Sequence, residues 1–564
     1  MFEPLRSRPE RWLFTALIGL LLAPVVVQGA GRTIASLLGE ASAAAALSPA
    51  AMILALVAWL VGAARAGLHV GVDAVILGAS GLGLGLVLGL GVSGLLALAL
   101  VGAGALVLAR WLPERLPPAL DGLFPRCRVL ALVYAAAALL SVVQVARVSV
   151  FMGDPTRSDA QLIPDNEFLG RHSCLSAYVR AGELARERVD NLYLHERWPI
   201  AVMAEERPET RFSPFDLVAF FYPPPFLLVS EVLTPLSGDF LAQRAAWFAL
   251  NGLLVAFGFW IGARAFGGAR WHRPLLLAPI LFGSIPMLVI FQVGQAQAAV
   301  VIVSILAMLA FELRRPALGG FALALTIAAK ISPGLFGIVL LVQRRWRDAA
   351  WTAAFGALLL LLSLVAYGSD PIVSWLTYTL PRLSSGEAFA EIFKHGESVA
   401  LNLAPAGMPF KLELLGVDFD DPWAIARRVN QAFTLIVVGL AVVVGLRHRA
   451  EAGEPRTSRA LAWMALLFFA SLRSPFAPSY VAFALLWAMT VASVEVESWR
   501  GGVGLFVLAL ALSIAPPLDP AGLAVYVMVV EGAVLVFALA LILRGAASPG
   551  RGSAGSPATR GRSS

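Results

Sequence analysis

Apolar segments separated by short, arginine-containing connections run through most of the 564-residue chain. A helix needs about 20 apolar residues to cross a bilayer; several segments reach that length and others are shorter. With 59% hydrophobic and 14% charged residues, the composition is typical of a polytopic membrane protein. We therefore predict an all-α polytopic membrane protein with about 13–16 transmembrane or re-entrant helices. The candidate segments are approximately 12–29, 46–65, 70–89, 92–110, 128–150, 242–264, 274–292, 296–313, 317–330, 333–343, 350–367, 426–446, 459–472, 476–494, 501–516 and 521–543.

The arginines also predict the orientation, because cytoplasmic connections carry an excess of positive charge. Arginines before the first segment place the N-terminus in the cytoplasm of what we interpret as a bacterial plasma membrane protein. A basic loop at 447–459 and the basic tail place the C-terminus there too. Counting membrane crossings from the N-terminus and from the C-terminus gives the same topology only if 215–237 does not cross the membrane. Three consecutive prolines, Pro223 to Pro225, break a helix there, so we predict a re-entrant or interfacial segment.

This topology divides the chain into three parts. Residues 1–126 form an additional N-terminal transmembrane module, 127–545 form the main transmembrane core, and 546–564 form a disordered, low-complexity cytoplasmic tail. The core carries two extracytoplasmic loops, 151–214 and 368–425. In the first loop, the run SAYVRAGELARER predicts a short amphipathic helix.

One lysine, Lys330, lies inside apolar sequence in the stretch from Gly294 to Trp346, in a chain with three lysines and forty arginines. A charge within a membrane is costly and by default marks a functional site or a partner. The alternative is that the side chain snorkels to an interface. Between basic turns at Arg315 and Arg344 there is room for two short helices of roughly 13 residues, each about 20 Å long. We predict that Lys330 lies in the outer half of the membrane and faces a cavity open to the outside.

Other polar residues converge on the same predicted outer face. Arg473 lies on the predicted outer side, against the positive-inside pattern, so topology does not explain it and an anionic ligand would. A carboxylate beside cations at a membrane cavity suits group transfer from a lipid phosphate, with the carboxylate as general base and Lys330 and Arg473 on the phosphate. Taken singly, a loop acid is more often a solvated charge, and glutamines also bond neighbouring helices. The candidates are Asp154, Asp159, Asp165, Glu167, His172, Asp216, Tyr222, Gln292, Gln295, Gln297 and Tyr480.

Cysteine content and net charge indicate whether metals, cofactors or nucleic acids are expected as ligands. Cys127 and Cys174 are too few for a disulfide framework, and no metal-ligand spacing is present, so we expect no metal and no cofactor. The net charge of +7 does not indicate nucleic acid, because the arginines lie at the ends of apolar runs. Membrane lipids are the expected surroundings.

The pattern GQAQ, a basic turn, and then GGFALALTIAAKISPGLFGIVLLVQRRW resembles the core of glycosyltransferase family 87. That family belongs to the C-type (GT-C) integral-membrane glycosyltransferases and includes polyprenol-phosphomannose-dependent mannosyltransferases. FFYPPPFLL resembles its Tyr-Pro-Pro segment, and Tyr178 with the sequence after it resembles the start of its first extracytoplasmic region. The similarity covers roughly 128–545. It implies a GT-C fold and inverting transfer of a sugar, most often mannose, from a polyprenyl-phosphate donor to a lipid or glycan acceptor on the outer face.

The resemblance also implies roles for single residues. Such enzymes place a catalytic Asp in the first extracytoplasmic loop, and their basic residues contact the carrier phosphate, which suits Lys330. The family's Asp usually lies a few residues before the position of Tyr178, where this chain reads HSCLSAY, so we expect the base upstream, at Asp165 in preference to Asp159. The family's second glutamine-turn position is often Asn, and its late segment usually has a His that RSPFAPSY lacks. The expected site is Asp165 or Asp159 as base, Lys330 and Arg473 on the phosphate, and His172, Tyr222, Gln295 and Gln297 around the donor.

A transporter or flippase of lipid-linked sugars is the alternative hypothesis, because broken helices and an intramembrane cation also occur in transporters. Transporters show repeated halves and little extracytoplasmic sequence. This chain has no exact internal repeat and two outer loops of about 55–65 residues, which favours the transferase.

Overall fold

The structure is a computed structural model that describes residues 141, 144–163, 166–198, 210–233, 238–271, 273–274, 277, 281–449, 454–496, 499–513, 516 and 518–544. Every regular element in these ranges is a helix. Four of the helices are long and apolar enough to cross a membrane, and a bent pair adds a fifth candidate span. The prediction of an all-α polytopic membrane protein is thus confirmed. The N-terminal module 1–126 and the tail 546–564 lie outside the described residues.

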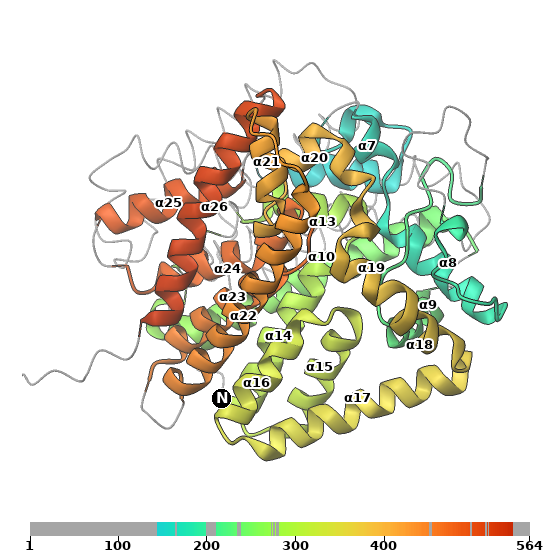
Figure 1. Ribbon diagram of the computed structural model, residues 1–564. Helices are drawn as coiled ribbons and strands as arrows, with labels where there is room; N and C mark the ends of the chain where they lie inside the picture. The colour runs from blue at the N-terminus through green and yellow to red at the C-terminus, as the bar shows by residue number, and fades with distance from the viewer. Residues whose placement is uncertain are drawn as a thin grey trace, which may run out of the picture.

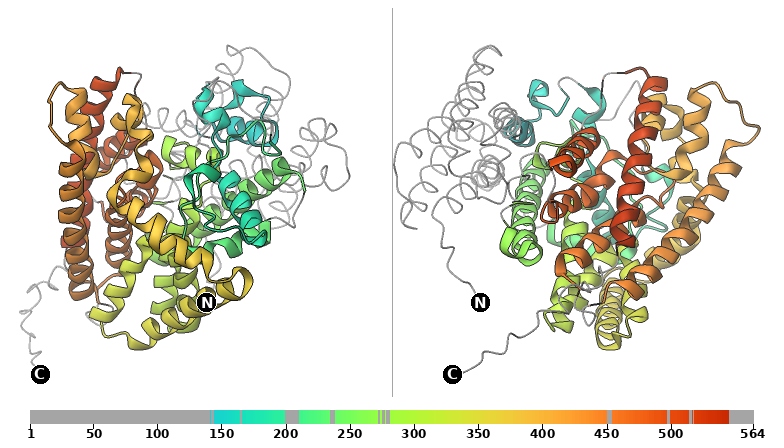
Figure 2. Two further views of the ribbon diagram at one scale, coloured as in Figure 1. Left: turned by 45° about the vertical axis from the view of Figure 1, so that its right-hand side comes forward. Right: turned by 90° about the vertical axis from the view of Figure 1, so that its left-hand side faces the viewer.

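The four long helices are α10 (Phe240–Gly267), α17 (Trp346–Tyr367), α22 (Pro422–Arg447) and α26 (Pro520–Leu543). Asp239 and Asp421 cap α10 and α22 by accepting a backbone N–H of the first turn, which satisfies a donor that the helix leaves free. In the left view of Figure 2, the red α26 and the orange α22 run side by side. Exposed apolar side chains on α17, such as Leu361 at 54% and Val365 at 73%, fit a surface that contacts lipid.

The stretch around Lys330 is built from shorter helices. α13 (Ile285–Val293) and α14 (Gln297–Glu312) meet at an angle of 109°. Gly294 allows this turn because it adopts the left-handed conformation, with φ of 70°. α15 (Pro316–Ala329) and α16 (Leu335–Val342) follow, with 14 and 8 residues. At 1.5 Å per residue they span roughly 21 and 12 Å, so the two-helix prediction holds and the second helix is shorter than expected.

The described part of the proline-rich segment, 215–233, has no regular structure before Pro224. A 3₁₀ turn at Pro224–Phe226 leads into α9 (Leu227–Leu233), which has only seven residues. This helix is roughly 10 Å long, well short of a bilayer. The three prolines account for the irregular backbone, because each removes a donor and fixes φ.

Several short helices lie in the two predicted outer loops. The first loop contains α7 (Glu167–Arg171) and α8 (Cys174–Arg186), the latter as predicted. The second contains α18 (Asp370–Ser374), a π-helical turn (Trp375–Thr379), α19 (Leu380–Ser385), α20 (Gly396–Ala400) and α21 (Met408–Leu414). In Figure 1, α7, α20 and α21 lie at the top, and the turn between α16 and α17 lies at the bottom. Three further helices are α23 (Arg456–Ser471), α24 (Phe483–Ala492) and α25 (Trp499–Ser513).

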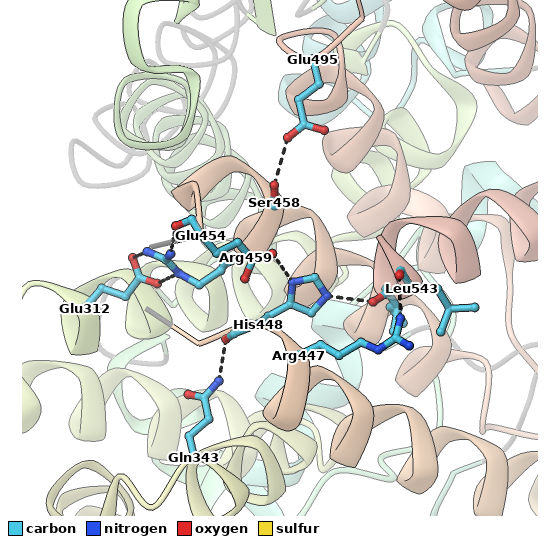
Figure 3. Close-up of polar contacts among 10 residues, drawn as sticks. Glu312, Gln343, Arg447, His448, Glu454, Ser458, Arg459, Glu495 and Leu543 are labelled. Carbon is cyan, nitrogen blue, oxygen red and sulfur yellow. Dashed lines mark hydrogen bonds and ion pairs between the residues drawn. The ribbon is translucent and has the colours of Figure 1, made fainter. Parts of the chain in front are cut away.

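Polar side chains join the helix ends near the α14–α15 and α16–α17 turns (Figure 3). Arg459 of α23 donates to both carboxylate oxygens of Glu312, at 2.5 and 2.9 Å, and both side chains are nearly inaccessible. His448 Nδ1 lies 2.6 Å from Glu454 Oε1, and His448 Nε2 lies 2.8 Å from the Ile542 carbonyl oxygen of α26. Buried groups of this kind require partners, so the cluster fixes how these helix ends pack.

Candidate functional site

A cavity of about 1800 Å³ lies among the elements of the two predicted outer loops. Its lining includes residues from the first loop, the proline-rich segment, the α13–α14 turn and the α15–α16 break. It also includes residues of the second loop and of the connection after α23. Of the residues predicted for the site, His172, Tyr222, Gln295, Gln297, Lys330 and Arg473 all line this cavity.

Two tyrosines and a glutamine form the centre of the cavity wall. The Tyr178 and Tyr222 hydroxyls lie 2.8 Å apart, and both donate to Gln295 Oε1, at 3.0 and 2.8 Å. Gln295 Nε2 in turn donates to Tyr480 Oη at 3.3 Å. Gln295 reaches this position because it directly follows the left-handed Gly294. Its amide therefore ties α8, the proline-rich segment and the connection after α23 together.

Lys330 is the residue that ends α15, and a 3₁₀ turn containing Pro333 begins two residues later, at Ser332. Its Nζ donates to Gln297 Oε1 at 2.7 Å, and Gln297 Nε2 donates to Ser471 Oγ at 3.3 Å. The ammonium also lies over the Tyr480 ring, 5.4 Å from the centroid. Such cation–π contacts stabilise a cation without neutralising it.

Arg473 is the second cation of the cavity. Its Nε donates to Thr434 Oγ1 at 3.4 Å, and the side chain is half-buried. Among the described residues, no carboxylate lies within 4.0 Å of either Arg473 or Lys330. Other cations on the lining are paired: Arg427 lies 3.8 Å from Asp421, and Lys394 lies 2.7 Å from Glu391. The cavity therefore holds two cations whose charge is available to an anionic ligand.

Of the two predicted general bases, the structure describes Asp159 but not Asp165. Asp159 is 63% exposed, accepts two hydrogen bonds of 2.9 Å from Arg157, and is not part of the cavity lining. The Arg157 hydrogen bonds lower the pKa of the Asp159 carboxyl, which makes it a weaker base. Asp165 lies outside the described residues, but Ile163 and Asn166 line the cavity.

His172 lines the cavity between α7 and α8. Its ring stacks on Phe168 at 4.9 Å between centroids, and its Nε2 lies 3.6 Å from Cys174 Sγ. Burial lowers the pKa of His172 to about 4, so the ring is neutral near pH 7. Nδ1 is buried and has no hydrogen-bond partner in the described part of the chain. His172 therefore brings no positive charge to the cavity near pH 7.

The structure brings into the site two residues to which the sequence analysis gave no role, Tyr178 and Ser471, and one, Asp216, that it named only among the candidates. Tyr178 served only as a marker of the family resemblance, yet its hydroxyl closes the Gln295 cluster. Ser471 links Gln297 to α23. Asp216 is 7% exposed, lines the cavity and lies 3.6 Å from Arg171 Nε. A tyrosine and an acid flanking predicted membrane segments were the available signals, but their pairing depends on how distant segments pack.

The described residues contain no group of three or more His, Cys, Asp or Glu side chains placed to hold a metal ion. Cys174 is a free, buried thiol.

Comparison with known proteins gives one match. The family model Glycosyltransferase family 87 matches residues 220–475, a narrower range than the 128–545 expected from the sequence resemblance. The matched range contains Tyr222, Gln295, Gln297, Lys330 and Arg473, and it excludes the loop acids and His172. No curated protein and no solved structure matches the chain.

Proposed function

Because this chain belongs to glycosyltransferase family 87, we propose that it transfers a sugar, mannose in the first instance, from a polyprenyl-phosphate donor to a lipid or glycan acceptor. The reaction would take place on the extracytoplasmic face of a bacterial plasma membrane. The observation that carries the proposal is that Lys330 and Arg473 line one large cavity without a carboxylate partner among the described residues. A phosphate between them would supply the missing negative charge.

In the proposed reaction, a carboxylate accepts the proton of an acceptor hydroxyl, and the hydroxyl oxygen forms a bond to C1 of the donor sugar. The bond between C1 and the phosphate oxygen breaks, and polyprenyl phosphate leaves with the electron pair. Lys330 and Arg473 stabilise the negative charge that develops on the leaving phosphate. Attack on the face opposite the phosphate inverts the configuration at C1.

We assign the general base to Asp165 before Asp159. Support comes from Gln292, whose side chain holds the loop on both sides of Asp165: the Leu162 N–H donates to Gln292 Oε1 at 2.7 Å, and Gln292 Nε2 donates to the Leu169 carbonyl at 2.9 Å. Leu162 and Leu169 both line the cavity. The exposed ion pair of Asp159 with Arg157 speaks against the alternative.

The apolar part of the cavity suits the polyprenyl chain. It is lined by side chains that offer no hydrogen bond and so favour a hydrocarbon ligand. These residues are Ile285, Val289 and Val293 of α13, Leu512 of α25, and Val527 and Val530 of α26.

The test uses purified protein in lipid nanodiscs with radiolabelled polyprenyl-phosphomannose and the host's lipid extract. We expect labelled product with the wild type, loss of product with Lys330→Ala, and normal product with Arg347→Ala. Arg347 is the matched control because it is an exposed cation of the same stretch, beside the α16–α17 turn. Equal transfer by folded wild type and Lys330→Ala would refute the phosphate assignment.

A transporter of lipid-linked sugars is the competing function, and the 109° bend between α13 and α14 is the observation in its favour. If folded protein turns over no lipid-linked sugar in a panel of donors, transport assays in proteoliposomes become the decisive measurement.

A further inference from the structure

Two connections between helices share one backbone conformation and one pair of residues. They are 313–315, between α14 and α15, and 343–345, between α16 and α17, and we call them the arginine turns. In each turn the first arginine is left-handed, Arg314 with φ of 56° and Arg344 with φ of 57°. Its N–H bonds the carbonyl three residues before it, at 3.1 and 3.0 Å, and the N–H of the second arginine bonds the carbonyl five residues before it, at 2.9 Å. Both turns are therefore Schellman caps of the preceding helix.

Arginine is an unfavourable residue at the left-handed position of such a cap. Its Cβ crowds the backbone there, and glycine is the usual choice. The chain uses glycine in this conformation at Gly294 after α13 and at Gly386 after α19. A topology signal would not require the unfavourable choice, because Arg315 and Arg345 supply positive charge one residue later. A residue held in a costly conformation is evidence that its side chain has a function.

The two arginine turns are neighbours. Arg345 Cζ lies 5.6 Å from the centroid of the Phe311 ring, which belongs to the last turn of α14. Figure 3 shows Glu312 and Gln343, which precede the two arginine pairs, joined to the same buried cluster around His448. Neither turn contributes to the lining of the large cavity. The turns thus bring arginines from two connections to one place, away from the candidate active site.

Three of these arginines carry a charge that no carboxylate balances within the described ranges. Arg314, Arg315 and Arg344 are exposed, and none of them has an ion pair or a side-chain hydrogen bond there. Nearby acids are already used, since Glu312 pairs within the buried cluster and Asp348 accepts from the fourth arginine at 2.7 Å. The turns therefore present concentrated positive charge, and guanidinium groups match the oxygens of a phosphate.

Apolar side chains flank these charges. Leu313 is 46% exposed, Leu341 is 48% exposed and Trp346 is 63% exposed. α17 starts at Trp346 and continues with the exposed apolar side chains of a surface that fits lipid. Tryptophan and arginine together at the end of an apolar helix are typical of the membrane interface, where headgroup phosphates lie. A lipid phosphate accounts for the charged and the apolar side chains together, whereas a soluble anion accounts only for the charged ones.

We propose that the arginine turns bind the phosphate of an anionic phospholipid headgroup, with Arg314, Arg315 and Arg344 as its ligands and the acyl chains beside α17. The bound lipid would bridge the two turns and hold α15 and α16 at a fixed depth in the membrane. The site is separate from the large cavity, so this inference does not depend on the proposed function.

The test titrates dioleoylphosphatidylglycerol into full-length protein in a neutral detergent and measures binding by native mass spectrometry, with dioleoylphosphatidylcholine as the zwitterionic comparison. We expect phosphatidylglycerol to bind the wild type more tightly than phosphatidylcholine does. The double variant Arg314→Gly, Arg344→Gly should bind it roughly 25-fold more weakly, about fivefold for each cation lost near an anionic headgroup. Glycine suits the left-handed backbone, so the variant should unfold at the same temperature as the wild type or higher in phosphatidylcholine nanodiscs.

Arg188→Gly is the matched control. Arg188 is an exposed arginine with φ of 51°, so it shares the residue type and the backbone conformation, but it follows α8 in another part of the chain. Its variant should bind phosphatidylglycerol within twofold of the wild type. If the double glycine variant does not fold, Arg315→Gln removes one charge without changing a left-handed position and should weaken binding about fivefold.

Lys330→Ala separates the arginine turns from the large cavity, whose cations could also attract an anionic lipid. It should keep the affinity for the most tightly bound phosphatidylglycerol within twofold. The inference is overturned if this variant, rather than the glycine variant, loses that lipid, if the glycine variant binds as the wild type does, or if the two phospholipids bind the wild type equally. Displacement of phosphatidylglycerol by an equal concentration of inorganic phosphate would assign the turns to a soluble anion and overturn the lipid assignment.

Discussion

Replacing Lys330 by methionine should lower kcat/KM about 100- to 1000-fold without destabilising the protein. Methionine keeps the length of the side chain and removes the charge. The Lys330 ammonium has a Gln297 oxygen at 2.7 Å and no carboxylate among the described residues, so a donor phosphate would be its strongest partner. Loss of one donor to a developing anion costs about 2.7–4 kcal/mol in the transition state, which corresponds to that fall in rate.

The effect of Lys330→Met on folding should be small because two contributions oppose each other. Gln297 Oε1 loses its donor, which costs about 1 kcal/mol, while the desolvation of an ammonium with no counterion is relieved. The measurements are initial rates of mannose transfer in nanodiscs and thermal unfolding followed by tryptophan fluorescence. Arg347→Met is the control and should match the wild type in both. A variant that unfolds several degrees earlier and keeps its rate per folded molecule would show that Lys330 only braces the helices.

Three further predictions follow from pairs and clusters in the structure. Glu312→Gln leaves Arg459, which is 5% exposed, without its carboxylate and should lower the free energy of unfolding by about 3–5 kcal/mol. Lys394→Ala breaks an exposed ion pair and should lower it by less than about 1 kcal/mol. Equal losses in thermal unfolding would contradict this. Tyr222→Phe removes one of the two hydroxyl donors to Gln295 and should slow mannose transfer roughly two- to tenfold, and an unchanged rate would exclude that cluster from the donor site. Burial lowers the pKa of His172 from 6.5 to about 4, so the neutral ring contributes stability above pH 6.5 that is lost as the pH falls toward 4. His172→Asn should therefore lose less stability than the wild type in acid unfolding titrations. Superimposable titration curves would contradict the pKa shift.

The sequence predicts those parts of the site that follow from membrane topology. Lys330 and the glutamine turn were expected on one face because each lies at the predicted outer end of a short helix, and the Lys330–Gln297 hydrogen bond of 2.7 Å shows that the two lie together. Three prolines before Phe226 predicted a segment that does not cross, and α9 has only seven residues. Such features are set locally, by helix length and by residues that end helices.

Features that depend on packing between distant segments could not be predicted. Asp159 had the right sequence context for a base, but it pairs with Arg157 away from the cavity. The Tyr178–Tyr222 contact joins residues 44 positions apart, one in α8 and one in the irregular proline-rich segment, and no periodicity encodes it. The π-helical turn at Trp375–Thr379 has no sequence signature either. Loop paths of this kind are decided by which buried polar groups find partners.

A comparison within the chain gives the strongest argument that Lys330 acts on a ligand. Lys411 is a fully buried lysine, with 0% exposure, and it lies 2.8 Å from Glu531, which is 3% exposed. A lysine that serves packing alone thus has a carboxylate to balance its charge, as the cost of a buried ion requires. Lys330 has a glutamine oxygen and two tyrosine rings instead, among the described residues, and it borders the large cavity. Lys330 is only half-buried, so its charge can be reached from the cavity, and we propose that an anionic leaving group in the cavity is its counterion.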